Sequence, residues 1–120
     1  MDQIDDLLAA TLRSIANPRR LRIIHLLAEG PREVARLAAE LGISQPNASQ
    51  HLGVLRAAGL VDAERVGREV RYRLVDPDVT VACTQMRRVL ARRLDRLAEL
   101  ASGPARPPRP THRLPGHAVR

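Results

Sequence analysis

The spacing of the apolar residues changes twice along this chain, and this limits the possible folds more than any other feature. Up to Gly59 the apolar residues recur every three or four positions, which is the period of an amphipathic helix. From Val61 to Leu74 they alternate with charged residues, as in a strand, and after Pro77 the helical spacing returns. The pattern predicts four helices, one hairpin and a long final helix.

Capping and terminating residues divide the helical part at fixed points. Asn17 followed by a proline is typical of a helix start, and Ser44 two positions before a proline is another. Gly42 and Gly59 follow apolar runs and predict helix ends. Pro31 is expected to open the third helix. The predicted fold is mainly α with one β-hairpin, in the order α-α-α-α-β-β-α.

The composition fits a single small helical domain. The chain has 120 residues, of which 44% are hydrophobic, and its one aromatic residue is Tyr72. A core without large rings is built from Leu, Val, Ile and Ala, which suits packed helices. We expect residues 1–101 to form this domain. Residues 102–120 hold five of the nine prolines and no acidic residue, and they are predicted to be a disordered basic tail.

The charge balance favours an anionic partner. All 20 basic residues are arginines, and against 13 acidic residues they give a net charge of +7. Such a balance is typical of proteins that bind nucleic acids. An acidic protein surface or an anionic membrane would satisfy the same arithmetic.

The sequence argues against several functional classes. No apolar run approaches the roughly 18 residues of a membrane span, and residues 1–10 carry three aspartates, unlike a signal peptide. We therefore predict a cytoplasmic protein without a membrane partner. The single cysteine, Cys83, excludes a disulfide within the chain. An acid–base pair, an activated nucleophile and a phosphate-binding loop are all missing, so an enzyme is not expected.

Two helices joined by the short turn at residues 41–44 have the spacing of a helix-turn-helix motif. The second helix of such a motif enters the major groove with its first residues against the base edges. Glutamine and asparagine can each bond adenine in a bidentate way, and a serine cap leaves backbone N–H groups for a phosphate. The candidate DNA-binding residues of this helix are Ser44, Gln45, Pro46, Asn47, Ser49, Gln50 and His51. The alternative is an ordinary solvated polar face.

The hairpin carries cations at a place with no role in a core. Arg65, Arg68 and Arg71 are predicted to contact DNA phosphates or a narrow minor groove, and Arg73 lies beside them. A charged hairpin edge can equally serve to prevent pairing between strands of two molecules.

Three separated segments together resemble the ArsR/SmtB family of bacterial winged-helix repressors. They are residues 44–61 (SQPNASQHLGVLRAAGLV), the hairpin segments 65–68 (RVGR) and 72–74 (YRL), and residues 17–23 (NPRRLRI). The resemblance covers about residues 12–76. It implies a winged helix-turn-helix homodimer that binds double-stranded, palindromic operator DNA, with the first and last helices at the dimer interface. The apolar stripes of those helices supply the candidate interface residues Ile4, Leu7, Leu8, Leu12, Met86, Leu90, Leu94 and Leu97.

The metal sites that the resemblance suggests are incomplete in this chain. Residues 33–37 hold no thiol, and Asp76 is followed by Asp78 where zinc sensors have a histidine. Cys83 is predicted to be a packing thiol, with a reactive thiol as the alternative. His112 and His117 could capture nickel or zinc, although incidental histidines on a solvated tail explain them as well. No cofactor is assigned, and these five residues remain candidates for a divalent metal.

The sequence leaves three functions open. The first is a homodimeric repressor that binds an operator. The second keeps the fold but makes the chain the DNA-binding subunit of a two-component regulator, with a partner protein that senses nickel, another metal or some other effector. The third is a protein-interaction module whose arginines contact acidic partners, and it predicts no sequence preference on DNA.

Overall fold

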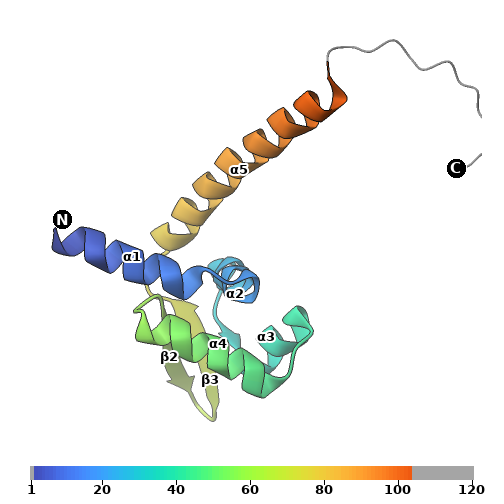
Figure 1. Cartoon of the computed structure of the whole chain (residues 1–120). Coiled ribbons are helices and arrows are strands. Elements are labelled where there is room, and N and C mark those ends of the chain that lie inside the picture. The colour runs from blue at the N-terminus through green and yellow to red at the C-terminus, as the bar shows by residue number, and fades with distance from the viewer. Residues whose placement is uncertain (1, 104–120) are drawn as a thin grey trace, which may run out of the picture. The chain divides into compact units, whose positions relative to one another are not determined.

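The computed structural model describes residues 2–103, and the chain divides after Cys83 into two compact units. The first unit contains helices, a small sheet and the first turns of the last helix, and the described part of the second unit is the rest of that helix (Figure 1). The elements are α1 (Gln3–Ile15), α2 (Pro18–Ala28), β1 (Arg32–Glu33), α3 (Val34–Leu41), α4 (Gln45–Ala57), β2 (Val61–Val66), β3 (Glu69–Leu74) and α5 (Asp78–Ser102). The predicted tail lies outside the described residues from position 104 onward.

The prediction that Pro31 opens the third helix is wrong. The backbone at Arg32 and Glu33 is extended and forms β1, which pairs antiparallel with β3, and α3 begins only at Val34. Arg32 lies opposite Tyr72 in this pairing. A two-residue strand has no period that a sequence can display, so the third strand of the sheet could not be expected from the apolar pattern.

The predicted helix starts at Asn17 and Ser44 are confirmed. The Asn17 side chain accepts hydrogen bonds from the backbone N–H groups of Arg19 (2.9 Å) and Arg20 (3.2 Å). Ser44 Oγ accepts from the N–H of Asn47 at 3.2 Å. Each bond satisfies a donor that the first turn of a helix leaves without an intrahelical partner.

The core lies between α2, α3, α4 and the start of β2. Helix α2 supplies four apolar side chains, while α3 and α4 supply three from their inner faces. Full burial of one such side chain contributes about 1.5–3 kcal/mol. The buried cluster is Ile23, Ile24, Leu26, Leu27, Leu37, Leu52, Leu55, Leu60 and Val61.

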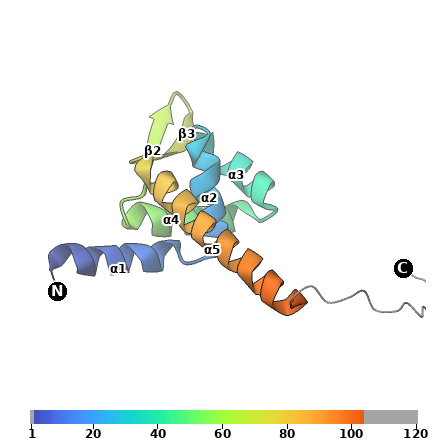
Figure 2. The same cartoon turned by 90° about the horizontal axis from the view of Figure 1, so that it is seen from above.

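The sheet has the strand order β1-β3-β2, and β2 and β3 form the predicted hairpin. Its two-residue turn is Gly67-Arg68, with Gly67 at φ +66°, where glycine is favoured because it has no Cβ. Tyr72 and Leu74 pack against the core, so the alternate residues of β3, among them Arg71, lie on the opposite face of the sheet. The end of the hairpin projects beyond the helices of this unit in both views (Figures 1 and 2).

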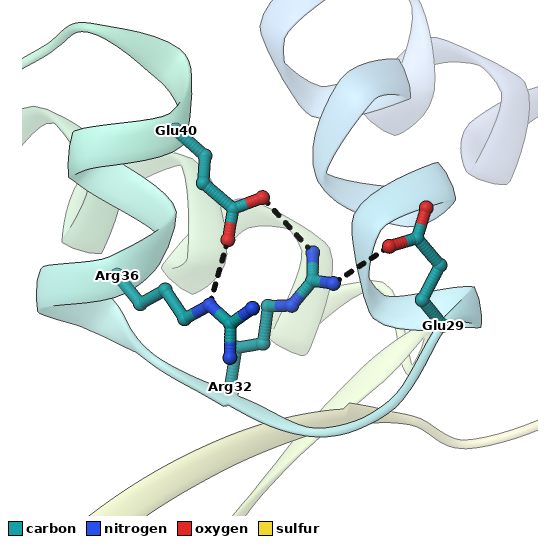
Figure 3. Close-up of polar contacts among 4 residues, drawn as sticks. All are labelled: Glu29, Arg32, Arg36 and Glu40. Atoms are coloured by element: carbon teal, nitrogen blue, oxygen red, sulfur yellow. Dashed lines mark hydrogen bonds and ion pairs between the residues drawn. The ribbon is translucent and has the colours of Figure 1, made fainter.

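A buried arginine ties β1 to two helices. The Arg32 side chain is 7% exposed and donates to Glu29 at the end of α2 (2.7 Å) and to Glu40 on α3 (3.2 Å). Arg36 donates to the other oxygen of Glu40 at 2.9 Å, which completes the four-residue cluster in Figure 3. The hydrogen bond and charge of Arg32 lower the pKa of the Glu29 carboxyl. The cluster fixes the short strand against the helix-turn-helix.

Helices α1 and α5 each leave an apolar stripe exposed. The side chains of Ile4 and Leu7 on α1 are 67% and 61% exposed, and those of Leu94 and Leu97 on α5 are 67% and 48% exposed. Neither helix contains a buried residue. No helix in residues 2–103 combines the length and the apolar character needed to cross a bilayer.

Candidate nucleic-acid interface

The first two turns of α4 present a row of polar side chains with unused hydrogen-bonding groups. Gln45, Asn47, Ser49 and Gln50 are all exposed. Helix α4 buries only its opposite face, so these side chains do not contribute to the core. None of the four side chains has a hydrogen-bond partner among residues 2–103. An α-helix fits the major groove, where amide side chains can pair with adenine and small hydroxyls with several bases.

The start of α4 also provides backbone donors. The hydroxyl of Ser44 satisfies the N–H of Asn47, while Pro46, the second residue of the helix, has no N–H to satisfy. The N–H groups of Ser44 and Gln45 lie at the positive end of the helix dipole, a suitable place for a phosphate.

His51 differs from the other candidates on α4. Its ring is half-buried, and Nδ1 lies 3.3 Å from a terminal guanidinium nitrogen of Arg20 on α2. A guanidinium can only donate, so Nδ1 is the acceptor and the proton of the neutral ring is on Nε2. Burial first, and then the charges of Arg20 and Arg19, lower the pKa of His51, which is therefore neutral at pH 7.

The arginines of the hairpin fall into two groups. Arg65 and Arg68 are exposed and have no partner in the described part of the chain. Arg71 donates to Glu69 at 3.2 Å, and Arg73 lies 3.6 Å from both Asp62 and Glu64. Pairing leaves less of the charge of Arg71 and Arg73 for a phosphate. Of the three predicted wing contacts, Arg65 and Arg68 are therefore the better placed and Arg71 is the weaker.

The candidate metal ligands within residues 2–103 do not come together. Asp76 Oδ1 accepts from the backbone N–H of Asp78 at 2.9 Å, so its carboxylate caps the start of α5. Cys83 is half-buried, and burial raises the pKa of its thiol, which favours the protonated form at pH 7. No group of three or more His, Cys, Asp or Glu side chains in this range could hold a metal. His112 and His117 lie outside the described residues.

Two arginines with structural contacts were not singled out in the sequence. Arg20 and Arg32 resemble any other charged residue in a basic chain, and their partners are distant or lie on another element. Only one feature of the sequence could have indicated a structural role for Arg20. It lies in the first turn of the helix capped by Asn17, close to the end of the preceding helix.

Comparison with known proteins shows which group of proteins this chain resembles. Residues 17–63 match the family described as bacterial regulatory protein, arsR family. The chain is 43% identical over 94 residues to Rv0081, an uncharacterized HTH-type transcriptional regulator of Mycobacterium tuberculosis, covering 77% of this chain and 82% of the relative. It is 47% identical over 74 residues to the HTH-type transcriptional repressor SmtB of the same organism, covering 62% of this chain and 55% of that protein.

Solved structures agree with this similarity. The crystal structure of Rv0081 superposes with a TM-score of 0.74 at 37% identity, covering 82% of this chain and all of the other. The homodimeric winged helix-turn-helix DNA-binding domain of Mb0332 from Mycobacterium bovis gives a TM-score of 0.71 at 34% identity, covering 78% of this chain and 86% of that domain. The predicted winged helix-turn-helix fold and the family resemblance are confirmed.

Proposed function

This chain belongs to the ArsR family of bacterial regulatory proteins, and from that membership we propose that it binds operator DNA through α4 and the hairpin as a homodimer. It is a DNA-binding transcriptional regulator. The bound dimer represses transcription by blocking the polymerase. The family is one of regulatory proteins, and we propose that the chain acts by binding DNA and not by catalysing a reaction.

One observation carries the proposed DNA contact. The exposed polar side chains on the first two turns of α4 have no intramolecular partner, whereas many charged side chains elsewhere are paired. Hydrogen-bonding groups that are not used by the fold are available to base edges. Arg65 and Arg68 would add phosphate contacts beside them, which strengthen binding to any sequence.

The exposed stripes of α1 and α5 support the proposed homodimer. Leu7, Leu8, Leu90 and Leu94 are 61%, 52%, 48% and 67% exposed. Extended apolar surface of this kind marks interaction sites in small domains. A two-fold dimer would place two copies of α4 against successive turns of the major groove, which is the arrangement that a palindromic operator requires.

Selection from a random library of DNA duplexes tests whether the protein recognises a specific base sequence. We expect the wild-type protein to enrich one palindromic sequence and to bind it more tightly than a shuffled duplex. Asn47→Ala or Gln45→Ala should weaken binding to the selected duplex by about 1–3 kcal/mol while leaving shuffled DNA unaffected.

Gln85→Ala provides the control because it removes an exposed amide from α5 instead of α4. It should leave both affinities unchanged. If no sequence is enriched, operator recognition is contradicted, and an arginine surface for acidic proteins becomes the better explanation.

A second candidate is a DNA-binding subunit whose effector is sensed by a partner protein. The capping role of Asp76 and the raised pKa of the Cys83 thiol favour it, because both reduce the ligands that residues 2–103 could offer. It predicts that zinc, nickel, a chelator and an oxidant leave the affinity for the selected duplex unchanged. Release of DNA by any one of them would assign sensing to this chain instead.

A further inference from the structure

We infer that Arg20 is a positioning residue that holds the DNA-reading helix α4 through His51, while its own guanidinium stays off the DNA. The inference rests on the proposed function, because it presupposes that α4 reads bases. It also removes His51 from the residues that read the operator.

The Arg20 guanidinium joins three helices. Its Nε donates to the backbone oxygen of Ser14 in the last turn of α1 at 2.5 Å, and a terminal nitrogen contacts Nδ1 of His51 at 3.3 Å. The backbone N–H of the same residue is bound by the Asn17 cap of α2. One side chain therefore fixes the end of α1, the start of α2 and the second turn of α4 to one another.

Each contact satisfies a group that would otherwise lack a partner. The last carbonyls of a helix have no intrahelical donor, so the Ser14 oxygen needs one, and a cation is favoured at this negative end of the α1 dipole. Arg20 and His51 are both half-buried. At partly buried sites a hydrogen bond from a charged donor is stronger than one between neutral groups.

The contact fixes how α4 is turned. His51 lies four residues after Asn47, so the two side chains are on the same side of the helix, one turn apart. Together with the buried side chains of Leu52 and Leu55, the held imidazole sets the rotation of α4 about its axis and with it the direction of Asn47. A bidentate amide–adenine contact depends on such alignment, so a small rotation costs specific binding but not phosphate attraction.

Arg20→Met separates positioning from phosphate binding. The variant keeps an unbranched side chain but loses both donors. We expect affinity for the selected duplex to fall about tenfold, the equivalent of one base contact, with affinity for the shuffled duplex and the salt dependence unchanged. Arg19→Met is the matched control, since it removes the same charge from the neighbouring position, whose side chain makes no hydrogen bond within residues 2–103.

A second pair of variants tests whether the effect passes through His51. His51→Gln retains an acceptor that Arg20 can reach and should keep most of the specific affinity, whereas His51→Leu should lose it. The double variant Arg20→Met/His51→Leu should be no weaker than Arg20→Met alone, because the contact between Arg20 and His51 is already lost in that variant. Sedimentation and thermal unfolding of each variant must show the wild-type oligomeric state and a folded chain.

The pH profile supplies a readout that a general structural role would not move. Protonation of His51 turns Nδ1 into a donor that faces the Arg20 cation, with Arg19 as the other nearby charge on α2. The pKa of His51 lies below the ordinary histidine value of about 6.5, so specific affinity should be constant above that pH and should fall as the pH drops below it. The profile of His51→Gln should not show this fall.

The outcomes distinguish this inference from the proposed function. If wild type prefers no sequence, the proposed function fails and the inference fails with it. If wild type is selective but Arg20→Met loses equal affinity for both duplexes, with a salt slope lower by about one, Arg20 is a phosphate contact and only the inference is overturned. Unchanged selectivity in Arg20→Met, or additive losses in the double variant, would also overturn it.

Discussion

At the residue scale, the arginines differ by what their guanidinium groups contact. Arg32 is buried between two carboxylates, and Arg20 joins three helices. Arg65 and Arg68 are exposed and have no partner among residues 2–103. Every arginine adds the same positive charge to the composition. Some of them stabilise the fold, however, and others remain available for an anionic partner.

Replacement of Arg32 tests the structural group. Arg32→Ala should lower the free energy of unfolding by about 2 kcal/mol, since it removes a buried side chain and its two ion pairs. Arg32→Met keeps most of the packing and should cost about half as much. Urea unfolding followed by circular dichroism, at one protein concentration, measures both. Arg36→Met loses only an exposed pair with Glu40 and should change stability by less than about 0.5 kcal/mol. An equal loss in all three variants would contradict this account of Arg32.

At the element scale, the helix-turn-helix and the hairpin divide the proposed DNA contact between base reading and phosphate binding. Helix α4 buries one face and leaves its polar residues free, while the hairpin extends past the core with arginines on both sides. Arg73 is held on the outer face of the sheet by two carboxylates. Arg68 occupies the turn, where nothing in the described chain pairs with it.

The hairpin arginines should therefore respond differently to substitution. Arg68→Ala is expected to weaken binding to every duplex and to reduce the slope of log affinity against log salt by about one, as for the loss of one phosphate contact. Arg73→Ala removes the same charge from the same hairpin and should change the slope by much less. Titrations against selected and shuffled DNA at several salt concentrations provide the measurement. Equal slopes for Arg68→Ala and wild type would rule out the turn as a phosphate contact.

At the scale of the whole molecule, the proposed homodimer rests on the apolar stripes that α1 and α5 each leave exposed. Met86, Leu90 and Leu100 are 59%, 48% and 76% exposed, and no residue of α5 is buried. Burial of apolar surface contributes about 25 cal/mol per Å², so a second copy that covered such stripes would gain substantial stability. Dimerisation would thereby link folding stability to protein concentration.

Disruption of one stripe tests the proposed dimer. Leu94→Glu places a charge on the apolar side of α5 and should shift the protein from dimer to monomer in analytical ultracentrifugation. Arg88→Gln changes the net charge equally but lies on the opposite side of the helix, so it should remain dimeric. The monomeric variant should also lose most of its affinity for a palindromic duplex, since only one half-site is engaged. If Leu94→Glu dimerises with the same dissociation constant as the wild type, the stripe on α5 is not part of the dimer interface.

The sequence alone determined the features that depend on neighbouring residues. The change of apolar period predicted the helices and the hairpin, and the residue types at Asn17 and Ser44 predicted where helices begin. The polar row on α4 and the stripes of α1 and α5 follow from helical spacing in the same way. These features can be predicted locally because the repeat of apolar residues in a helix or strand is visible within a short stretch of sequence.

Only the tertiary structure decided which side chains are available. It added β1, whose two residues pair with a strand some forty positions later, and it brought Arg20 against His51, which the sequence had assigned to base reading. It also showed that Arg71 and Arg73 form ion pairs within the hairpin, whereas Arg65 and Arg68 have no partner among residues 2–103. The physical reason is that the residue type of a charged side chain does not indicate which group it will contact in the folded chain. Whether it is used by the fold or left for DNA depends on contacts between distant segments.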